Sequence, residues 1–255
     1  MRLVDRIRAK RAERQLLLMT HIVVGYPDLK TSLELVDAMV EAGVDLMELQ
    51  IPFSEPIADG PVILKANALA LQNGITVDTC LEFAERVTKR HSIPFLFMTY
   101  YNILFRRGLQ RFVADARAAG ISGAIVPDCP LEESEPYVNA MQEGSLAPVF
   151  IFSPRTPDDR LHALGHAGDG LVYVVARKGV TGSRTEFSDD LALYLARCRA
   201  ATELPLAVGF GLKSKADVDF LVGKADIAVI GTQSLRLLEE GGVPAVKSFL
   251  SGLRG

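Results

Sequence analysis

The stretch LLLMTHIVVGYPDLKTSLELVDAMVEAGVDLMELQIP, residues 16–52, decides the fold class. It opens with an apolar run at 16–24 and closes with another at 45–52. A run that is apolar nearly throughout is typical of a strand that is covered on both faces, as in a parallel sheet. Between the runs, residues 29–43 repeat apolar side chains at helical spacing and end at a glycine. We therefore interpret residues 16–52 as a strand–helix–strand unit with parallel strands.

The same alternation continues to the end of the chain. Six further apolar runs, separated by amphipathic stretches, lie at 94–100, 123–128, 147–153, 170–176, 205–210 and 227–232. Eight strands alternating with helices in 255 residues predict an α/β fold, a (β/α)8 TIM barrel. A doubly wound open sheet is the alternative, but the even spacing without a shift in composition favours one barrel domain over residues 1–255. The basic stretch before residue 16 has a helix-forming composition and is expected to add an N-terminal helix.

The composition excludes several classes of protein. A net charge of −3 gives no electrostatic reason to expect nucleic acid or an anionic membrane surface as a partner. A hydrophobic fraction of 49% is too high for a disordered chain. The first apolar run is too short to span a membrane, and the start lacks the pattern of a secretory signal. Three cysteines, far apart in the sequence, indicate a reducing compartment, so we expect a cytoplasmic protein.

Active sites of such barrels lie where strands end and the following loops begin, which draws attention to ELQIPFSEPIADGP, residues 48–61. Glu48 lies within an apolar run, where a carboxylate is costly to bury unless it is paired or functional. Asp59 follows in the loop, before a glycine, where an Asp is commonly only a turn residue. At one barrel mouth, however, the two carboxylates would form a plausible acid/base pair in different environments.

Glycine-rich segments follow the last three runs: RKGVTGS (177–183), GFGLKS (209–214) and IGTQS (230–234). Small residues at these strand ends let backbone N–H groups approach a phosphate, and a helix N-terminus favours the anion. The four histidines form no constellation with metal-ligand spacing, and His21, in the first run, could face either a substrate or the core. We therefore expect carboxylate acid/base chemistry on a phosphorylated small molecule, without a metal or an organic cofactor.

Several separate motifs, in order, resemble the alpha subunit family of tryptophan synthase. The most specific is E-L-x-I-P-F-S-x-P-x-A-D-G-P at 48–61. It is supported by M-T-Y-Y-N (98–102), Y-x-x-x-R-x-G-V-T-G (173–182), G-F-G (209–211) and the glycine loop at Gly231. The resemblance runs almost from end to end.

The resemblance implies a lyase of tryptophan biosynthesis that cleaves indole-3-glycerol phosphate to indole and glyceraldehyde 3-phosphate by a retro-aldol reaction. Glu48 matches the acid/base residue, and Asp59 matches the carboxylate that holds the indole N–H. Thr181 matches a loop threonine that closes towards Asp59. The other matches are the active-site Tyr173, the site and interface residues Tyr101 and Asn102, and the phosphate-binding residues Gly182, Gly211, Gly231 and Thr232.

The resemblance also implies a partner. In this family indole passes to a beta subunit, which holds the pyridoxal phosphate, so no cofactor is implied for this chain. An assembly of two alpha and two beta subunits is expected.

The chain departs from the family pattern at the barrel mouth. Gln50 replaces a glycine, and His21 stands where the family is usually apolar. The loops after the second and third runs differ at Glu55, Leu64 and Ile103. These differences leave two alternatives open: a stand-alone lyase, and a ligand-binding barrel that mainly activates a beta subunit. Retention of Glu48 and Asp59 speaks against the second alternative, and an unrelated phosphosugar enzyme would not need the segment 48–61.

Overall fold

The structure is a computed structural model that describes residues 1–175, 189–209 and 211–254. Eight parallel strands close into a barrel in the order β1 to β8, and β8 pairs with β1. They are β1 (Leu17–Val23), β2 (Leu46–Gln50), β3 (Phe95–Met98), β4 (Gly123–Ile125), β5 (Ala147–Phe152), β6 (Val172–Val175), β7 (Leu206–Gly209) and β8 (Ile227–Ile230). The predicted TIM barrel is confirmed, and the open-sheet alternative is wrong.

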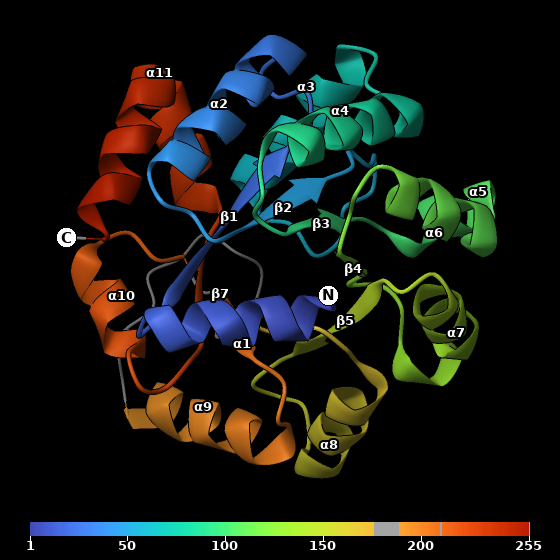
Figure 1. Cartoon of the computed structure of the whole chain (residues 1–255), viewed down its shortest axis with the longest axis vertical. Helices are drawn as coiled ribbons and strands as arrows, with labels where there is room; N and C mark the ends of the chain where they lie inside the picture. The colour runs from blue at the N-terminus through green and yellow to red at the C-terminus, as the bar shows by residue number, and fades with distance from the viewer. Residues whose placement is uncertain (176–188, 210, 255) are drawn as a thin grey trace.

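Helices surround the barrel on its outside (Figure 1). They are α1 (Leu3–Glu13), α2 (Leu29–Glu41), α3 (Pro61–Gln72), α4 (Val77–Arg90), α5 (Tyr101–Arg107), α6 (Leu109–Ala118), α7 (Glu135–Glu143), α8 (Asp158–Ala167), α9 (Asp189–Ala201), α10 (Lys215–Leu221) and α11 (Thr232–Gly252), with a short 3-10 helix at Leu131–Glu133. Within the described residues, none of these helices has the length and apolar character needed to cross a membrane.

The ends of the helices follow from local chemistry. Asp28 caps α2, where its carboxylate accepts the N–H of Thr31 at 2.8 Å. The Ser214 hydroxyl and the Asp217 carboxylate form a reciprocal capping box at the start of α10. Gly43, at a φ of +89°, lets the chain turn from α2 into β2, a backbone conformation that other residues rarely adopt.

The core has two layers. The larger cluster lies between the outer faces of the strands and the surrounding helices. The smaller cluster fills the barrel interior, and Leu3 and Ile7 of α1 belong to it together with Leu17 and Leu46. The expected N-terminal helix therefore exists, and in Figure 1 it lies across the opening of the barrel that faces the viewer. Because α1 covers the end where the strands begin, the end where they finish is left for a site.

Candidate active site

A cavity of about 110 Å³ lies at the end of the barrel where the strands finish. Its lining includes six of the residues proposed from the sequence: Glu48, Asp59, Tyr173, Gly211, Gly231 and Thr232. They come from strands and loops spread over most of the chain, so the barrel topology alone brings them together. The rest of the wall is largely apolar, including Ile63, Met98, Ile125 and Ile151.

Glu48 is paired with a histidine inside the barrel. The parallel register of β1 and β2 places His21 opposite Glu48, and Nδ1 of His21 lies 3.0 Å from Oε2 of Glu48. Both residues are buried, and Oε1 of Glu48 and Nε2 of His21 have no partner in the described structure. Burial lowers the pKa of His21, but contacts with Glu48, Asp59 and Gln50 outweigh it, so that the pKa is raised. His21, left open between core and substrate in the sequence, thus lies in the cavity.

Asp59 is held on the loop between β2 and α3. Its Oδ2 accepts a hydrogen bond from Nε2 of Gln50 at 2.6 Å and another from Nδ2 of Asn67 at 3.4 Å. Burial raises the pKa of Asp59, while contacts with Gln50, His21, Tyr100 and Asn67 oppose that rise. An Asp that only shapes a turn would be exposed to water. Asp59 is instead buried and accepts hydrogen bonds from two side-chain amides, so it is more than a turn residue.

Tyr173 projects from β6 beside both carboxylates. A Cβ added to Gly209, on the neighbouring strand β7, would lie 2.8 Å from the Tyr173 hydroxyl oxygen. The glycine therefore makes room for the phenol. Burial and the nearby Glu48 and Asp59 raise the pKa of Tyr173 well above its usual value, so the hydroxyl stays protonated.

Tyr100 supports the loop of Asp59 from outside the cavity lining, and sequence reasoning missed it. It is fully buried, its ring stacks on Phe53 with centroids 5.0 Å apart, and its hydroxyl accepts the N–H of Ala58 at 3.2 Å. These contacts hold the loop that bears Asp59. The neighbouring Tyr101 begins α5 and is not among the residues that line the described part of the cavity. Tyr100 lies two residues after Met98, on the inward face of the strand, and this alternation was the signal that could have found it.

Two of the glycines proposed for phosphate binding, Gly211 and Gly231, line the same cavity as the carboxylates. Gly211 follows β7 at a φ of +76°, and Gly231 precedes α11, which begins at Thr232. The first N–H groups of α11 have no partners within the helix and are suited to an anion. Thr181 and Gly182 lie outside the described residues. Among the described residues, no group of three His, Cys, Asp or Glu side chains could hold a metal ion.

The family model of the tryptophan synthase alpha chain matches residues 7–248. The chain belongs to this family. It is 59% identical to the alpha chain of Syntrophotalea carbinolica, over 97% of this chain and 98% of the relative. It is 57% identical to that of Desulforapulum autotrophicum, over 97% and 98% of the two chains.

Solved structures of the family share the fold. A tryptophan synthase structure from Mycobacterium tuberculosis superimposes with a TM-score of 0.92 at 32% identity, over 99% of this chain and 96% of that one. The alpha subunit from Legionella pneumophila gives 0.91 at 28% identity, over 100% and 97%. As a member of the alpha chain family, the chain is a lyase that cleaves indole-3-glycerol phosphate in tryptophan biosynthesis. The resemblance found in the motifs is thus confirmed.

Proposed function

We propose that Glu48 and Asp59 perform the cleavage of indole-3-glycerol phosphate in the cavity at the barrel mouth. The bond between the indole ring carbon and the glycerol chain breaks, and its electron pair returns to the ring carbon, which gains a proton. The hydroxyl next to that bond loses its proton and becomes the aldehyde of glyceraldehyde 3-phosphate. One proton enters and one leaves, so a single carboxyl group can serve both steps.

Glu48 is the group that we assign to these proton transfers. Its Oε2 is held by His21, and the buried Oε1 has no partner in the described structure and is available to the substrate. The unpaired oxygen of a buried carboxylate in the wall of the cavity is the observation on which the assignment rests.

Asp59 has a different task. Positive charge develops at the indole nitrogen as the ring carbon is protonated, and a buried carboxylate that accepts the indole N–H stabilises this charge. Tyr173 lies beside both carboxylates and would contact the ring. We assign the phosphate to Gly211, Gly231 and Thr232, together with Gly182, and closure over Asp59 to Thr181.

Substitution of each carboxylate tests the assignment. We expect Glu48→Gln to reduce turnover by about 10² to 10⁴-fold, while substrate binding stays nearly intact, because the amide cannot transfer the proton. Asp59→Asn should act similarly, since an amide lacks the charge. Glu55→Gln is the control, because this exposed carboxylate lies in the same loop. Single-turnover indole release and substrate binding are measured separately, and full turnover by Glu48→Gln would refute its role.

We further propose that the mouth of the barrel docks a beta subunit in an assembly of two alpha and two beta subunits. The chain resembles solved assemblies, among them a tryptophan synthase complex from Pyrococcus furiosus, with a TM-score of 0.86 at 30% identity. Around the mouth, Ile57 after β2 is 74% exposed, Phe105 on α5 is 70% exposed and Leu64 on α3 is 42% exposed. Large apolar side chains left in water at one end of a barrel suit a protein partner. Tyr101 and Asn102, at the start of α5, are assigned to the same interface.

The partner proposal is tested with a beta subunit from the same source. We expect it to stimulate indole release strongly, and Phe105→Ser to weaken that stimulation at least about tenfold without changing the activity of the isolated chain. Leu193→Ser is the matched control, because Leu193 is 64% exposed on α9, which follows β6 and not β2 or β3. High activity alone without stimulation would support the stand-alone lyase instead. Stimulation without lyase activity of the isolated chain would support the activator.

The three cysteines of the chain bear on the compartment in which the protein works. Cys80, Cys129 and Cys198 are buried and free, which suits a reducing compartment. We therefore propose that the protein is cytoplasmic, that residues 1–255 form one domain and that the reaction in this chain uses no cofactor of its own.

A further inference from the structure

His21 is a cavity residue to which the proposed reaction assigns no proton transfer. Its side chain is buried, and its Nδ1 lies 3.0 Å from Oε2 of Glu48. A buried imidazole in a barrel strand is costly unless it is paired, and among the described residues the ring is hydrogen-bonded to the acid/base residue.

The groups around His21 are acidic or uncharged. The titratable groups that face it are Glu48 on β2, Asp59 on the following loop and Tyr173 on β6. On the β8 side it packs against Gly231, whose Cβ, if present, would lie 3.5 Å from the Cβ of His21. Among the described residues that line the cavity, His21 is the only one that can carry a positive charge.

We propose that His21 is a positioning residue for Glu48: its Nδ1–H holds Oε2, so that Oε1 is the oxygen that exchanges protons with the substrate. This inference rests on the proposed role of Glu48. A glutamate side chain has three rotatable bonds, and fixing one oxygen selects a single orientation before the substrate arrives. Without the imidazole, Oε2 would be a second unpaired buried oxygen, and the carboxylate could turn either oxygen into the cavity.

The charge state of His21 decides whether Nδ1 keeps its hydrogen. The neighbouring carboxylates raise the pKa of His21 against the effect of burial, which favours the imidazolium, with a hydrogen on both ring nitrogens. A neutral imidazole has one ring hydrogen, which can lie on Nε2 instead and leave no donor for Oε2. Protonation of His21 therefore keeps the Nδ1–H donor in place.

Two variants of His21 separate positioning from packing. His21→Phe places an apolar ring of similar size at this position and removes the hydrogen bond. His21→Asn places an amide nitrogen where Nδ1 lies and keeps a donor for Oε2, but it cannot titrate. Thr20→Val is the matched control, because Thr20 is fully buried on the same strand and points to the other face, and its hydroxyl has no partner among the described residues.

We expect His21→Phe to lower kcat at least about tenfold with KM nearly unchanged, since hydrogen bonds to charged groups are strong. His21→Asn should keep kcat within about threefold of the wild-type value. In both variants the alkaline limb of the kcat/KM profile should move to higher pH by about one unit or more, because loss of a proton from His21 no longer contributes to it. Thr20→Val should change neither kcat nor the profile.

Three results would overturn the inference. Wild-type kcat and an unchanged pH profile in His21→Phe would show that the contact does nothing for Glu48. Equal losses of kcat in His21→Asn and His21→Phe would show that the donor is not what matters. Retained turnover in Glu48→Gln would remove the role of Glu48 itself, and the inference with it. An inactive Glu48→Gln beside a fully active His21→Phe would overturn only the role of His21.

Discussion

At the scale of single residues, two side chains each hold one carboxylate of the site. His21 holds Glu48, and Gln50 donates to Asp59 at 2.6 Å. His21 lies on β1, and Gln50 lies two residues after Glu48 on β2, on the same face of that strand. The two donors differ in kind: an imidazole can gain and lose a proton, whereas an amide cannot. Glu48 thereby has a partner suited to proton exchange, and Asp59 has one that supports a constant negative charge.

The amide of Gln50 gives a pH prediction. The hydrogen bond from Gln50 lowers the pKa of Asp59 against the rise that burial causes, and Gln50→Leu removes that bond. The pKa of Asp59 should then rise further, so that a higher pH is needed to deprotonate the carboxyl group. The acidic limb of the kcat/KM profile should move to higher pH by about one unit, because a hydrogen bond to a charged group contributes about 1.5–3 kcal/mol.

The measurement is indole release as a function of pH in Gln50→Leu and in Gln72→Leu. Gln72 is exposed at the end of α3, so its replacement should leave the limb in place. An acidic limb of Gln50→Leu that moves to lower pH, or not at all, would contradict the role of Gln50.

At the scale of the elements, periodicity located every strand but not its end. The run 123–128 predicted a longer strand than β4, which ends at Ile125, and the run 45–52 extends beyond β2, which ends at Gln50. The apolar residues that follow these strands are Val126 and Ile51, and both are buried. Apolar composition records burial, and burial continues into the loops where hydrogen bonding between strands has stopped.

The candidate site was predictable only in part, for a related reason. Glu48 and Asp59 stand out because a carboxylate in an apolar context is expensive. The pairing of His21 with Glu48 depends on the register of two strands, and a slip of one residue would turn His21 to the other face. Asn67 on α3 donates a hydrogen bond to Asp59, and no local sequence pattern of a helix predicts such a contact.

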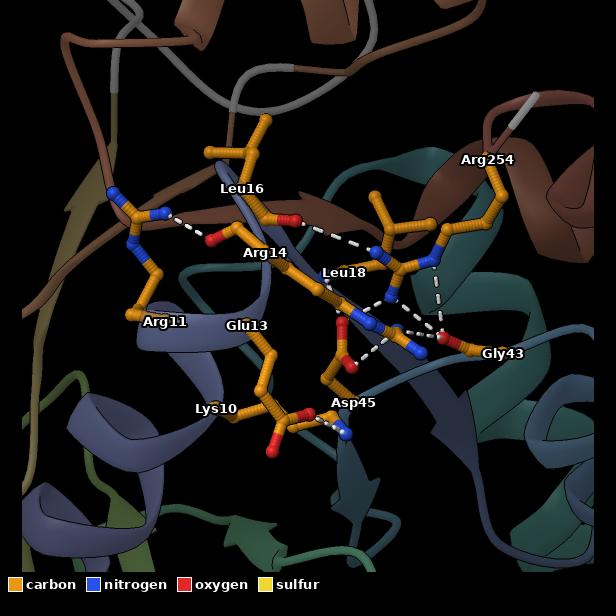
Figure 2. A network of polar contacts seen from close by, with 9 residues as sticks. All are labelled: Lys10, Arg11, Glu13, Arg14, Leu16, Leu18, Gly43, Asp45 and Arg254. Atoms are coloured by element: carbon orange, nitrogen blue, oxygen red, sulfur yellow. Dashed lines mark hydrogen bonds and ion pairs between the residues drawn. The ribbon is translucent and has the colours of Figure 1, made fainter.

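At the scale of the whole molecule, the segment after α1 and the C-terminal segment meet at the end of the barrel opposite the cavity. Asp45, just before β2, accepts a hydrogen bond from Arg14 at 2.6 Å and is also paired with Arg254 (Figure 2). Its Oδ2 accepts the N–H of Leu18 at 2.9 Å, and both arginines donate to the carbonyl of Gly43. One buried carboxylate thus joins the segment after α1, the start of the barrel and the C-terminal segment. This closure supports the proposal that residues 1–255 form one domain.

The network gives a stability prediction that separates it from the active site. Asp45→Asn keeps the size of the side chain but leaves Arg14 and Arg254 beside each other without the negative charge. Because the Asp45 side chain is only 2% exposed and removal of one partner of a buried pair is costly, we expect a loss of about 2 kcal/mol in the free energy of unfolding. For a chain of this length the melting temperature should fall by about 5 °C.

Glu13→Gln is the control, because its pair with Lys10 is exposed and water screens it, so that its loss should leave the melting temperature nearly unchanged. Thermal unfolding measures the loss, and kcat at 25 °C should stay within about twofold of the wild-type value, since the cavity is at the other end of the barrel. A melting temperature unchanged from wild type would show that water replaces Asp45 as the partner of the two arginines. A large loss of kcat in the folded variant would show that the two ends of the barrel are coupled.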